Sequence, residues 1–203
     1  MKQTGIIILA AGNSSRLGRP KQLLIHHGKT LLQHVYDEAI EACLSPVIVV
    51  FGAYEEEIEA TMKDAPLQKV VNNEWRTGMA SSIKAGLLEL AKFAGQVENV
   101  IISVCDQPLI SAKIFTSLIE EQQHTGKSII ASSYADTLGT PVLFNKQHFF
   151  NLFQLQGNEG AKKLLQIYAA DTSSIIFKDG QTDIDLESDY LDLIQQTAIN
   201  TGT

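Results

Sequence analysis

Cysteine is scarce in this chain, whose 203 residues include only Cys43 and Cys105. Two widely separated cysteines are too few for a disulfide framework or a zinc site. Long apolar runs are also missing, since none reaches the roughly 18–20 residues of a membrane span. The first strand predicted is too short for the core of a signal peptide. We therefore expect no membrane association, and a reducing cytoplasm is the simplest location.

Basic residues are also few compared with acidic ones. Lysine and arginine number 16 against 23 aspartates and glutamates, which gives a net charge of −7. Such a balance argues against indiscriminate binding of nucleic acid. A hydrophobic fraction of 44% with 19% charged residues is typical of a globular protein. Without repeats or a dividing linker, we expect one domain over residues 1–203.

Two widespread phosphate-binding motifs are absent. The opening loop does not supply the G-x-G-x-x-G of dinucleotide-binding proteins. Gly28-Lys29-Thr30 and Gly126-Lys127-Ser128 resemble the end of a P-loop. That motif needs a glycine five residues before its second glycine, where this chain has Leu23 and Glu121. Neither segment is a P-loop.

What the chain does contain is a distinctive opening, L-A-A-G-N-S-S-R-L-G-R-P-K-Q-L-L over residues 9–24. A short apolar strand runs into it, and small residues then let the backbone approach a ligand. Successive N–H groups in such a turn can bind an anion. Arg16 and Lys21 follow, and their charges suit a nucleoside triphosphate. An ordinary strand-to-helix turn with solvated charges is the alternative, which the spaced cations make less favourable.

Apolar runs alternate with segments of helical periodicity along the chain. The predicted strands cover residues 6–9, 46–51, 69–71, 99–105, 128–134, 140–145 and 174–178. This alternation predicts an α/β protein with a mostly parallel, doubly wound sheet covered on both faces. Ligands of such sheets lie beyond the carboxyl ends of the strands. The opening loop, residues 72–78 and Asp106 all follow strands, so we expect them to converge.

The opening loop resembles the signature of MobA-like nucleotidyltransferases, especially molybdenum cofactor cytidylyltransferases. Three further motifs extend the resemblance over nearly the whole chain: N-x-x-W-x-x-G-M-x-x-S-I at 72–83, C-D-Q-P at 105–108 and D-I-D-x-x-x-D-Y at 183–190. The resemblance implies a three-layer, nucleotide-diphospho-sugar transferase fold, which is GT-A-like and Rossmann-type. It also implies transfer of a nucleoside monophosphate from an NTP to a phosphorylated acceptor, with release of pyrophosphate.

The resemblance assigns residues to the nucleotide. The implied nucleotide-binding residues are Leu9, Ala10, Ala11, Gly12, Arg16, Lys21, Asn73, Gly78 and Ser82. Gly78 opens a predicted helix whose first N–H groups favour an anion or a base carbonyl. Trp75 and Met79 are interpreted as core residues. Family members that use GTP typically show L-A-G-G at positions 9–12, so CTP is favoured; we hypothesise that the methyl group of Ala11 disfavours a purine.

The resemblance also implies a Mg²⁺ site on Asp106 and Asp185, and Arg16, Lys21 and Asp106 as catalytic residues. Mg²⁺ takes one or two carboxylates together with phosphate oxygens. The alternative for Asp106 is a helix cap, for which Ser111 is better placed. Residues 182–185 are predicted to form a short strand with its two carboxylates at alternating positions. Asp183 and Asp189 are predicted to complement the dipole of the last helix.

The acceptor side departs from the commoner family pattern. The implied acceptor-binding residues are Gly139, Thr140, Pro141, Gly157, Gly160 and Lys162. Thr140 stands where G-H-P or G-N-P is typical, and Lys162 replaces an arginine, which loses a bidentate phosphate contact. The acceptor implied is the molybdenum–molybdopterin cofactor, with a molybdenum hydroxylase or its maturation factor as partner. A sugar- or alcohol-phosphate nucleotidyltransferase and a non-catalytic nucleotide- or cofactor-binding partner stay open.

The five histidines show no metal-ligand spacing and are interpreted as structural or solvated. No Ser/His/Asp arrangement is expected. No general base is assigned either, because a phosphate acceptor is already ionised near neutral pH.

Overall fold

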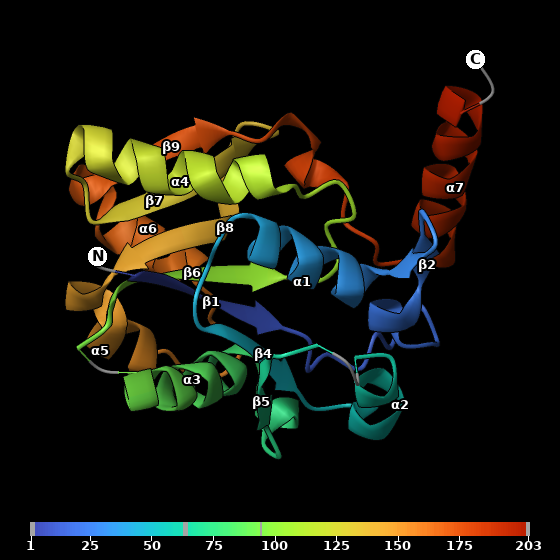
Figure 1. Ribbon diagram of the computed structural model, residues 1–203, viewed down its shortest axis with the longest axis horizontal. Helices are drawn as coiled ribbons and strands as arrows, with labels where there is room; N and C mark the ends of the chain where they lie inside the picture. The colour runs from blue at the N-terminus through green and yellow to red at the C-terminus, as the bar shows by residue number, and fades with distance from the viewer. Residues whose placement is uncertain (1–2, 63–64, 94, 202–203) are drawn as a thin grey trace.

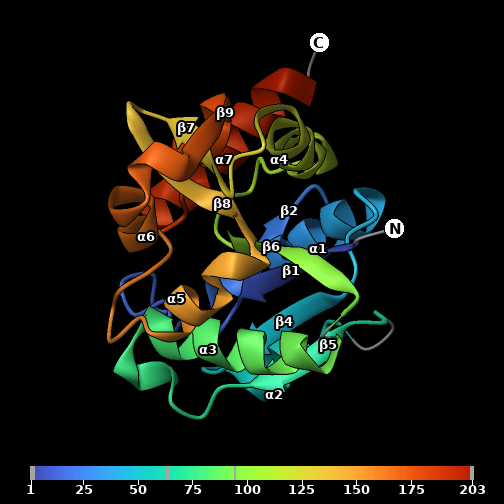
Figure 2. The ribbon, with the colours of Figure 1, turned by 90° about the vertical axis from the view of Figure 1, so that its left-hand side faces the viewer.

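A seven-stranded sheet forms the centre of the protein and separates two layers of helices (Figures 1 and 2). The computed structural model describes residues 3–62, 65–93 and 95–201. The sheet has the strand order β5-β4-β1-β6-β8-β7-β9, and β2 and β3 form a separate hairpin. The strands are β1 Gln3–Leu9, β2 Ile25–His26, β3 Lys29–Thr30, β4 Val47–Phe51, β5 Gln68–Val71, β6 Val97–Val104, β7 Ile129–Tyr134, β8 Thr137–Asn145 and β9 Thr172–Ile176.

The helices cover both faces of the sheet because the central strands are apolar on both sides. Ile6 and Ile8 of β1 pack with α1, α2 and α4, whereas Ile7 between them packs with α3, α5 and α6. This alternation is the period-two geometry of a strand. The helices are α1 Leu31–Glu41, α2 Glu55–Ala60, α3 Met79–Leu90, α4 Ala112–Thr125, α5 Phe149–Phe153, α6 Lys162–Ile167 and α7 Glu187–Thr201. The predicted three-layer α/β class is confirmed.

The sheet is parallel except at one strand. β5, β4, β1 and β6 run parallel, and β7 is parallel to β9. β8 is antiparallel to both of its neighbours, β6 and β7. The carboxyl ends of β1 and β6 therefore meet at one edge, as the strand pattern predicted. Asp106 follows β6 directly, and the opening loop follows β1.

Residues 182–185 contradict the predicted strand. They make no ladder, and the amide of Ile184 instead donates to the backbone carbonyl of Asp106 at 3.0 Å. The side chain of Ile184 is fully buried with Leu17, Leu24, Leu31 and Leu193. This small third core binds the segment to the opening loop rather than to a sheet edge. The predicted short strand at residues 182–185 is therefore wrong.

The helices α1 and α4 are capped in different ways. The Thr30 hydroxyl accepts from the amide of Gln33 at 3.0 Å and so caps α1. Ser111 occupies the cap position of α4, but its side chain makes no capping bond. The carboxylate of Glu38 accepts from the amide of Ala112 at 2.7 Å instead. Glu38 of α1 thus provides the acceptor for the first amide of α4 and joins the two helices on one face of the sheet.

Helix α7 lies at the margin of the molecule, beside the β2–β3 hairpin (Figure 1). The hydroxyl of Tyr190 donates to the carbonyl of Ile25 at 2.9 Å. The carboxylate of Asp189 accepts from the amides of Asp185 and Leu186 at 3.0 and 2.7 Å, as expected for an acid at a helix start. These bonds fix the segment that carries Asp185.

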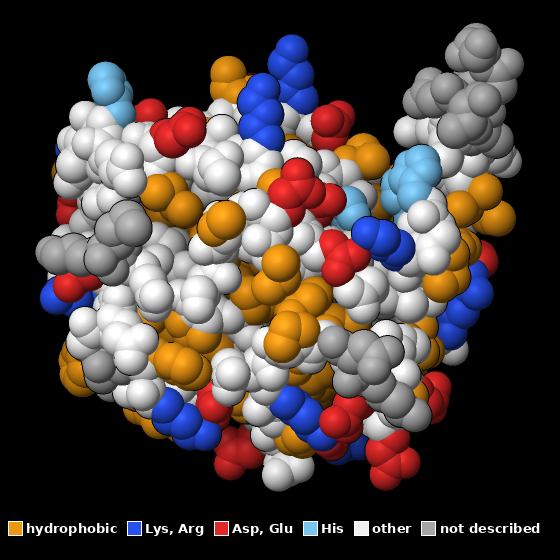
Figure 3. All heavy atoms as spheres, viewed as in Figure 1, with side chains coloured by type: hydrophobic (Ala, Val, Ile, Leu, Met, Phe, Trp, Pro, Cys, Tyr) orange, Lys and Arg blue, Asp and Glu red, His pale blue; other side chains and the backbone are white. Residues whose placement is uncertain are grey.

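Charged side chains of both signs are interspersed on the face shown in Figure 3, where lysine and arginine lie among aspartate and glutamate. Within the described ranges, no helix combines the length and hydropathy of a membrane span.

Candidate active site

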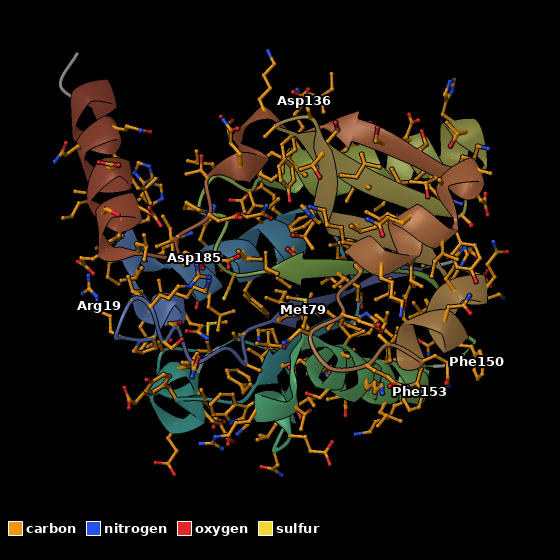
Figure 4. The ribbon with its side chains drawn as sticks, turned by 180° about the vertical axis from the view of Figure 1, so that it is seen from behind. Arg19, Met79, Asp136, Phe150, Phe153 and Asp185 are labelled. Atoms are coloured by element: carbon orange, nitrogen blue, oxygen red, sulfur yellow. The ribbon has the colours of Figure 1, made fainter. Side chains whose placement is uncertain are left out.

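A cleft of about 650 Å³ opens where β1 and β6 end. Its walls come from the opening loop, the segment before α3, the start of α3 and the end of β6. Figure 4 shows Asp185 beyond the tips of β1 and β6, and Met79 at the start of α3. The lining residues are Leu9, Ala11, Gly12, Asn13, Arg16, Lys21, Gln22, Trp75, Arg76, Gly78, Met79, Ser82, Val104, Cys105, Asp106 and Asn158.

The opening loop is held in shape from inside by Gln22. This side chain is 1% exposed, and its amide donates to the carbonyls of Ala10 and Gly12 at 2.8 and 2.9 Å. The Ser14 hydroxyl accepts from the amide of Lys21 at 3.1 Å and so closes the loop. Ala10 is fully buried and does not line the cleft, so only its backbone is engaged in shaping the site.

Lys21 joins the two aspartates that the resemblance singled out. Its ammonium lies 2.5 Å from Asp106 Oδ2 and 3.2 Å from Asp185 Oδ1. Burial lowers the pKa of Lys21, but the charge and hydrogen bond of Asp106 outweigh burial and hold it above its usual value. Lys21 is therefore an ammonium at neutral pH. We name Lys21, Asp106 and Asp185 the acid–lysine cluster.

Arg16 lies at the rim of the cleft. Its guanidinium donates to Asp185 Oδ2 at 2.7 Å, and its side chain is 68% exposed. Arg19 pairs outside the cleft with Glu187, also at 2.7 Å. The predicted convergence of the two loop cations and the two carboxylates is thus present, although the segments are separated by up to 169 residues.

Asp106 retains an oxygen suited to a divalent cation. Its Oδ1 is buried and has no hydrogen-bond partner, whereas Oδ2 carries Lys21. An unpartnered buried carboxylate oxygen is costly unless a cation contacts it. Within the part of the chain that the structure describes, no three or more His, Cys, Asp or Glu side chains cluster as metal ligands. Two carboxylates are the protein share that Mg²⁺ usually takes, so the donors fit.

Asp183 is an exposed residue whose carboxyl group is near the acid–lysine cluster. Partial burial of this group raises its pKa to about 6, and the charge of Asp106 adds to this effect. A hydrogen bond with the side chain of Gln107 acts in the opposite direction. The carboxylate of Asp189 accepts from the amides of Asp185 and Leu186, as expected for an acid at the start of α7. The same role for Asp183 stays a prediction.

Asn72 organises the wall of the cleft opposite the loop. Its buried amide donates to the hydroxyl oxygens of Ser81 and Ser82 at 2.8 and 3.0 Å. Because the Ser82 oxygen accepts this bond, its hydroxyl hydrogen can be donated into the cleft. Asn73, which the resemblance favoured, is exposed and does not line the cleft. The neighbouring Asn72 was missed, although it stands in the same motif.

The start of α3 is less open to an anion than predicted. The carbonyl of Gly157 accepts from the amide of Ala80 at 3.1 Å. Gly78 has φ +117°, and a Cβ there would lie 2.2 Å from the same carbonyl oxygen. This close approach requires glycine. The prediction that the amides from Gly78 to Ser81 are all free for a ligand is therefore wrong, because the loop that carries Gly157 already accepts from one of them.

Met79 contradicts its interpretation as a core residue, because it is 45% exposed and lines the cleft. Trp75 also lines the cleft, but it is partly buried against the core, as expected. The guanidinium of Arg76 stacks over the Trp75 ring at 4.2 Å. Helical periodicity places Met79 on the face of α3 toward the sheet, but Met79 is the first residue of the helix and extends past the sheet edge. A Cβ on Gly160 would lie 2.7 Å from the Met79 sulfur, so Gly160 makes room for it.

The six residues implied for the acceptor do not line the cleft, although Asn158 beside Gly157 does. Gly139 and Pro141 are buried within β8. A Cβ on Gly139 would lie 2.1 Å from the Tyr134 hydroxyl, so this glycine makes room for a tyrosine. Lys162 is exposed at the first position of α6. Their assignment to an acceptor stays a prediction.

A Ser/His/Asp arrangement does occur, contrary to expectation. The Ser128 hydroxyl donates to Asp171 Oδ2 and lies 2.6 Å from Nε2 of the buried His148. Asn151 approaches the other ring nitrogen of His148 at 3.4 Å. The serine hydroxyl thus donates a hydrogen bond to the acid and accepts one from the histidine. In a catalytic triad the serine instead donates to the histidine, so Ser128 is not arranged as an activated nucleophile. These three residues, the Ser128 cluster, hold together the strand ends opposite the cleft.

Related proteins were found by sequence. A nicotine blue oxidoreductase from Paenarthrobacter nicotinovorans is 31% identical over 144 residues, which cover 70% of this chain and 67% of that protein. A bifunctional protein GlmU from Baumannia cicadellinicola subsp. Homalodisca coagulata is 29% identical over 166 residues. That match covers 79% of this chain but 35% of GlmU, so the chain spans about a third of the GlmU length.

Solved structures share the fold. The crystal structure of Rv0371c from Mycobacterium tuberculosis H37Rv superposes with a TM-score of 0.81 and 26% identity, over 96% of this chain and 98% of that one. Its complex with manganese gives 0.79 and 25%, over 96% and 99%. The expected nucleotide-diphospho-sugar transferase fold is confirmed.

The profile of the MobA-like NTP transferase domain matches residues 6–173. This range begins in β1 and ends in β9, so it includes the opening loop, the start of α3 and Asp106. The chain therefore belongs to the MobA-like NTP transferase domain family, as its opening loop indicated.

Proposed function

We propose that this protein is a Mg²⁺-dependent nucleotidyltransferase that moves CMP from CTP to a phosphorylated acceptor and releases pyrophosphate. The observation that carries the proposal is the acid–lysine cluster, in which Lys21 contacts Asp106 at 2.5 Å and Asp185 at 3.2 Å at the mouth of the cleft. Membership of the MobA-like family supports an enzyme of the nucleotidyltransferase class.

The loop and its cations bind and orient the triphosphate. Gln22 fixes the loop backbone in advance, so little ordering is needed when the phosphates arrive. Lys21 and Arg16 stabilise the charge that develops on the α-phosphate and on departing pyrophosphate. An acceptor phosphate needs no general base, so positioning and charge neutralisation supply most of the catalysis.

Asp106 and Asp185 are the residues that would hold the divalent ion. The unpartnered oxygen of Asp106 supports this assignment, and so does the manganese complex of the related Rv0371c. When bound, such an ion neutralises charge on the phosphates of the nucleotide.

CTP is proposed as the nucleotide on the basis of the loop. Leu9 and Ala11 line the cleft on one side and Ser82 on the other, where its hydroxyl can meet a base edge. The methyl group of Ala11 narrows this space for a purine. Better turnover with GTP than with CTP would overturn the preference.

The molybdenum–molybdopterin cofactor is proposed as the acceptor, with a molybdenum hydroxylase or its maturation factor as the protein that receives the product. This proposal rests on the sequence motifs of the opening loop and residues 105–108. A sugar phosphate is the second candidate within the same reaction class, because GlmU proteins are among the relatives. An oxidoreductase is a second class of activity, because one relative carries that name.

One panel of assays separates these candidates. Labelled CTP, GTP and UTP are incubated with Mg²⁺ and each acceptor, and pyrophosphate release is followed. We expect release with CTP that depends on both the metal and the acceptor. Oxidation of a nicotinamide cofactor is measured in parallel. Absence of pyrophosphate release with every acceptor, together with cofactor oxidation, would overturn the proposed function.

A further inference from the structure

The two carboxylates proposed to hold the metal already carry cations from the opening loop. Lys21 contacts both of them, and it also lies 3.3 Å from the carbonyl of Ile184. Arg16 contacts the second oxygen of Asp185. Three of the four carboxylate oxygens of Asp106 and Asp185 therefore face a positive charge that belongs to the protein.

A free divalent ion must compete with this arrangement. The side chains of Lys21 and Asp106 are 16% and 19% exposed, so solvent screens their charges weakly. The flexible four-carbon stem of Lys21 allows its ammonium to move away from the carboxylates.

A triphosphate supplies the reason to move. Lys21 and Arg16 both line the cleft in which the nucleotide is proposed to bind. Phosphate oxygens are strong acceptors for both side chains. Each cation that turns toward a phosphate leaves a carboxylate oxygen without its positive partner. The negative charge of that oxygen is then available to a metal ion.

We infer that Lys21 is the internal counter-ion of the metal carboxylates, and that the protein binds its divalent ion together with the nucleoside triphosphate rather than before it. The inference rests on the proposed function, whose metal ligands it uses. Lys21 has two successive positions in this scheme: on the carboxylates without nucleotide, and on the phosphates with it.

The test is the affinity of the nucleotide-free protein for Mn²⁺, measured from the electron paramagnetic resonance signal of the free ion. Lys21→Met removes the charge and keeps the length of the side chain. We expect it to bind Mn²⁺ at least ~10-fold more tightly than the unmodified protein, the lower end of what one charge within 4–6 Å does to a carboxylate. Lys21→Arg keeps the charge and should bind Mn²⁺ as weakly as the unmodified protein.

Two controls make the result specific. Lys29→Met removes a lysine that pairs with Asp37 outside the cleft, so Mn²⁺ affinity should not change. Adding Asp106→Asn to Lys21→Met should abolish the gain. Lys21→Gln is measured alongside for the case in which the methionine variant does not fold. Its amide lacks the charge but can still hydrogen-bond the carboxylates.

The outcomes distinguish this inference from the proposed function. Equal or weaker Mn²⁺ binding in folded Lys21→Met or Lys21→Gln overturns the counter-ion role. Tight binding that survives Asp106→Asn also overturns it, since the ion then lies elsewhere. Failure of pyrophosphate release with all nucleotides would sink the proposed reaction, while the Mn²⁺ measurements would still report on the exchange.

Discussion

The acid–lysine cluster and the Ser128 cluster lie at opposite ends of the same sheet. Each is built from segments far apart in the chain, and each contains a carboxylate hydrogen-bonded to a side chain that can carry a proton. In the Ser128 cluster the buried ring of His148 has polar neighbours at both nitrogens. In the acid–lysine cluster, Asp106 Oδ1 is buried without a hydrogen-bond partner and borders a cleft. Of these two clusters, the acid–lysine cluster is the candidate site, because it has a polar atom left to bind a ligand.

The largest expected effect is at Asp106. Asp106→Asn keeps the shape of the side chain and removes the charge that pairs with Lys21 and that is proposed to bind the metal. We expect the rate of pyrophosphate release to fall by more than the ~10²–10³-fold that loss of one preorganised donor costs. Circular dichroism should show a folded protein. A variant that retains its rate would place the metal elsewhere.

Loss of the loop cations should have the next largest effect. Lys21→Ala and Arg16→Ala should each reduce turnover by ~10²–10³-fold, because each removes a charge that is proposed to stabilise the phosphates. Lys29→Ala, whose lysine pairs with Asp37 outside the cleft, is the matched control and should leave turnover unchanged. Unchanged turnover in both cleft variants would contradict the phosphate role.

The Ser128 cluster should affect stability and not turnover. Ser128→Ala leaves the buried His148 without its 2.6 Å partner. The free energy of unfolding should fall by ~1–3 kcal/mol, the usual cost of an unsatisfied buried polar group. Chemical denaturation measures this loss. Thr116→Ala removes a hydrogen bond from an exposed hydroxyl and should cost much less. A large drop in turnover at unchanged stability would make this cluster a second site.

The smallest expected effect is a pH dependence of stability. Burial lowers the pKa of His148 below 6.5, and it does the same at His26. Because the unfolded chain takes up these protons first, the contribution of the two histidines to stability is complete above about pH 6.5 and falls as the pH drops through the lowered folded values. The raised pKa of Asp183 acts in the opposite direction, so the comparison with the His148 variant isolates the histidine. Urea midpoints at about pH 7.5 and about pH 5.5 measure this slope. His148→Gln should flatten it, and an unchanged slope would exclude His148 as a contributor.

Much of the fold was predictable because buried parallel strands are apolar on every residue. Runs such as residues 6–9 and 46–51 show this directly, and Asp106 was placed at a strand end by its position alone. The strand predicted at 182–185 failed for a physical reason. A local alternation of polar and apolar residues does not reveal that the amide of Ile184 bonds to a carbonyl 78 residues earlier in the chain.

The site was predictable where a motif carries it and less so where tertiary contact decides. Periodicity identifies the inward face of α3 but not how far Met79 extends past the sheet. The carbonyl of Gly157 at the start of α3 and the reversed geometry of the Ser128 cluster have no local sequence pattern. Gln22 belongs to the opening motif, yet its role as an internal brace of the loop emerges only from its two hydrogen bonds.

The family match ends at residue 173, whereas Asp185 lies twelve residues beyond it. All seven strands are complete by Ile176, so the central sheet contains none of the segment that completes the acid–lysine cluster. That segment is held by α7 through the buried Leu193. Substitutions along α7 can therefore change the position of Asp185 without altering any residue that lines the cleft.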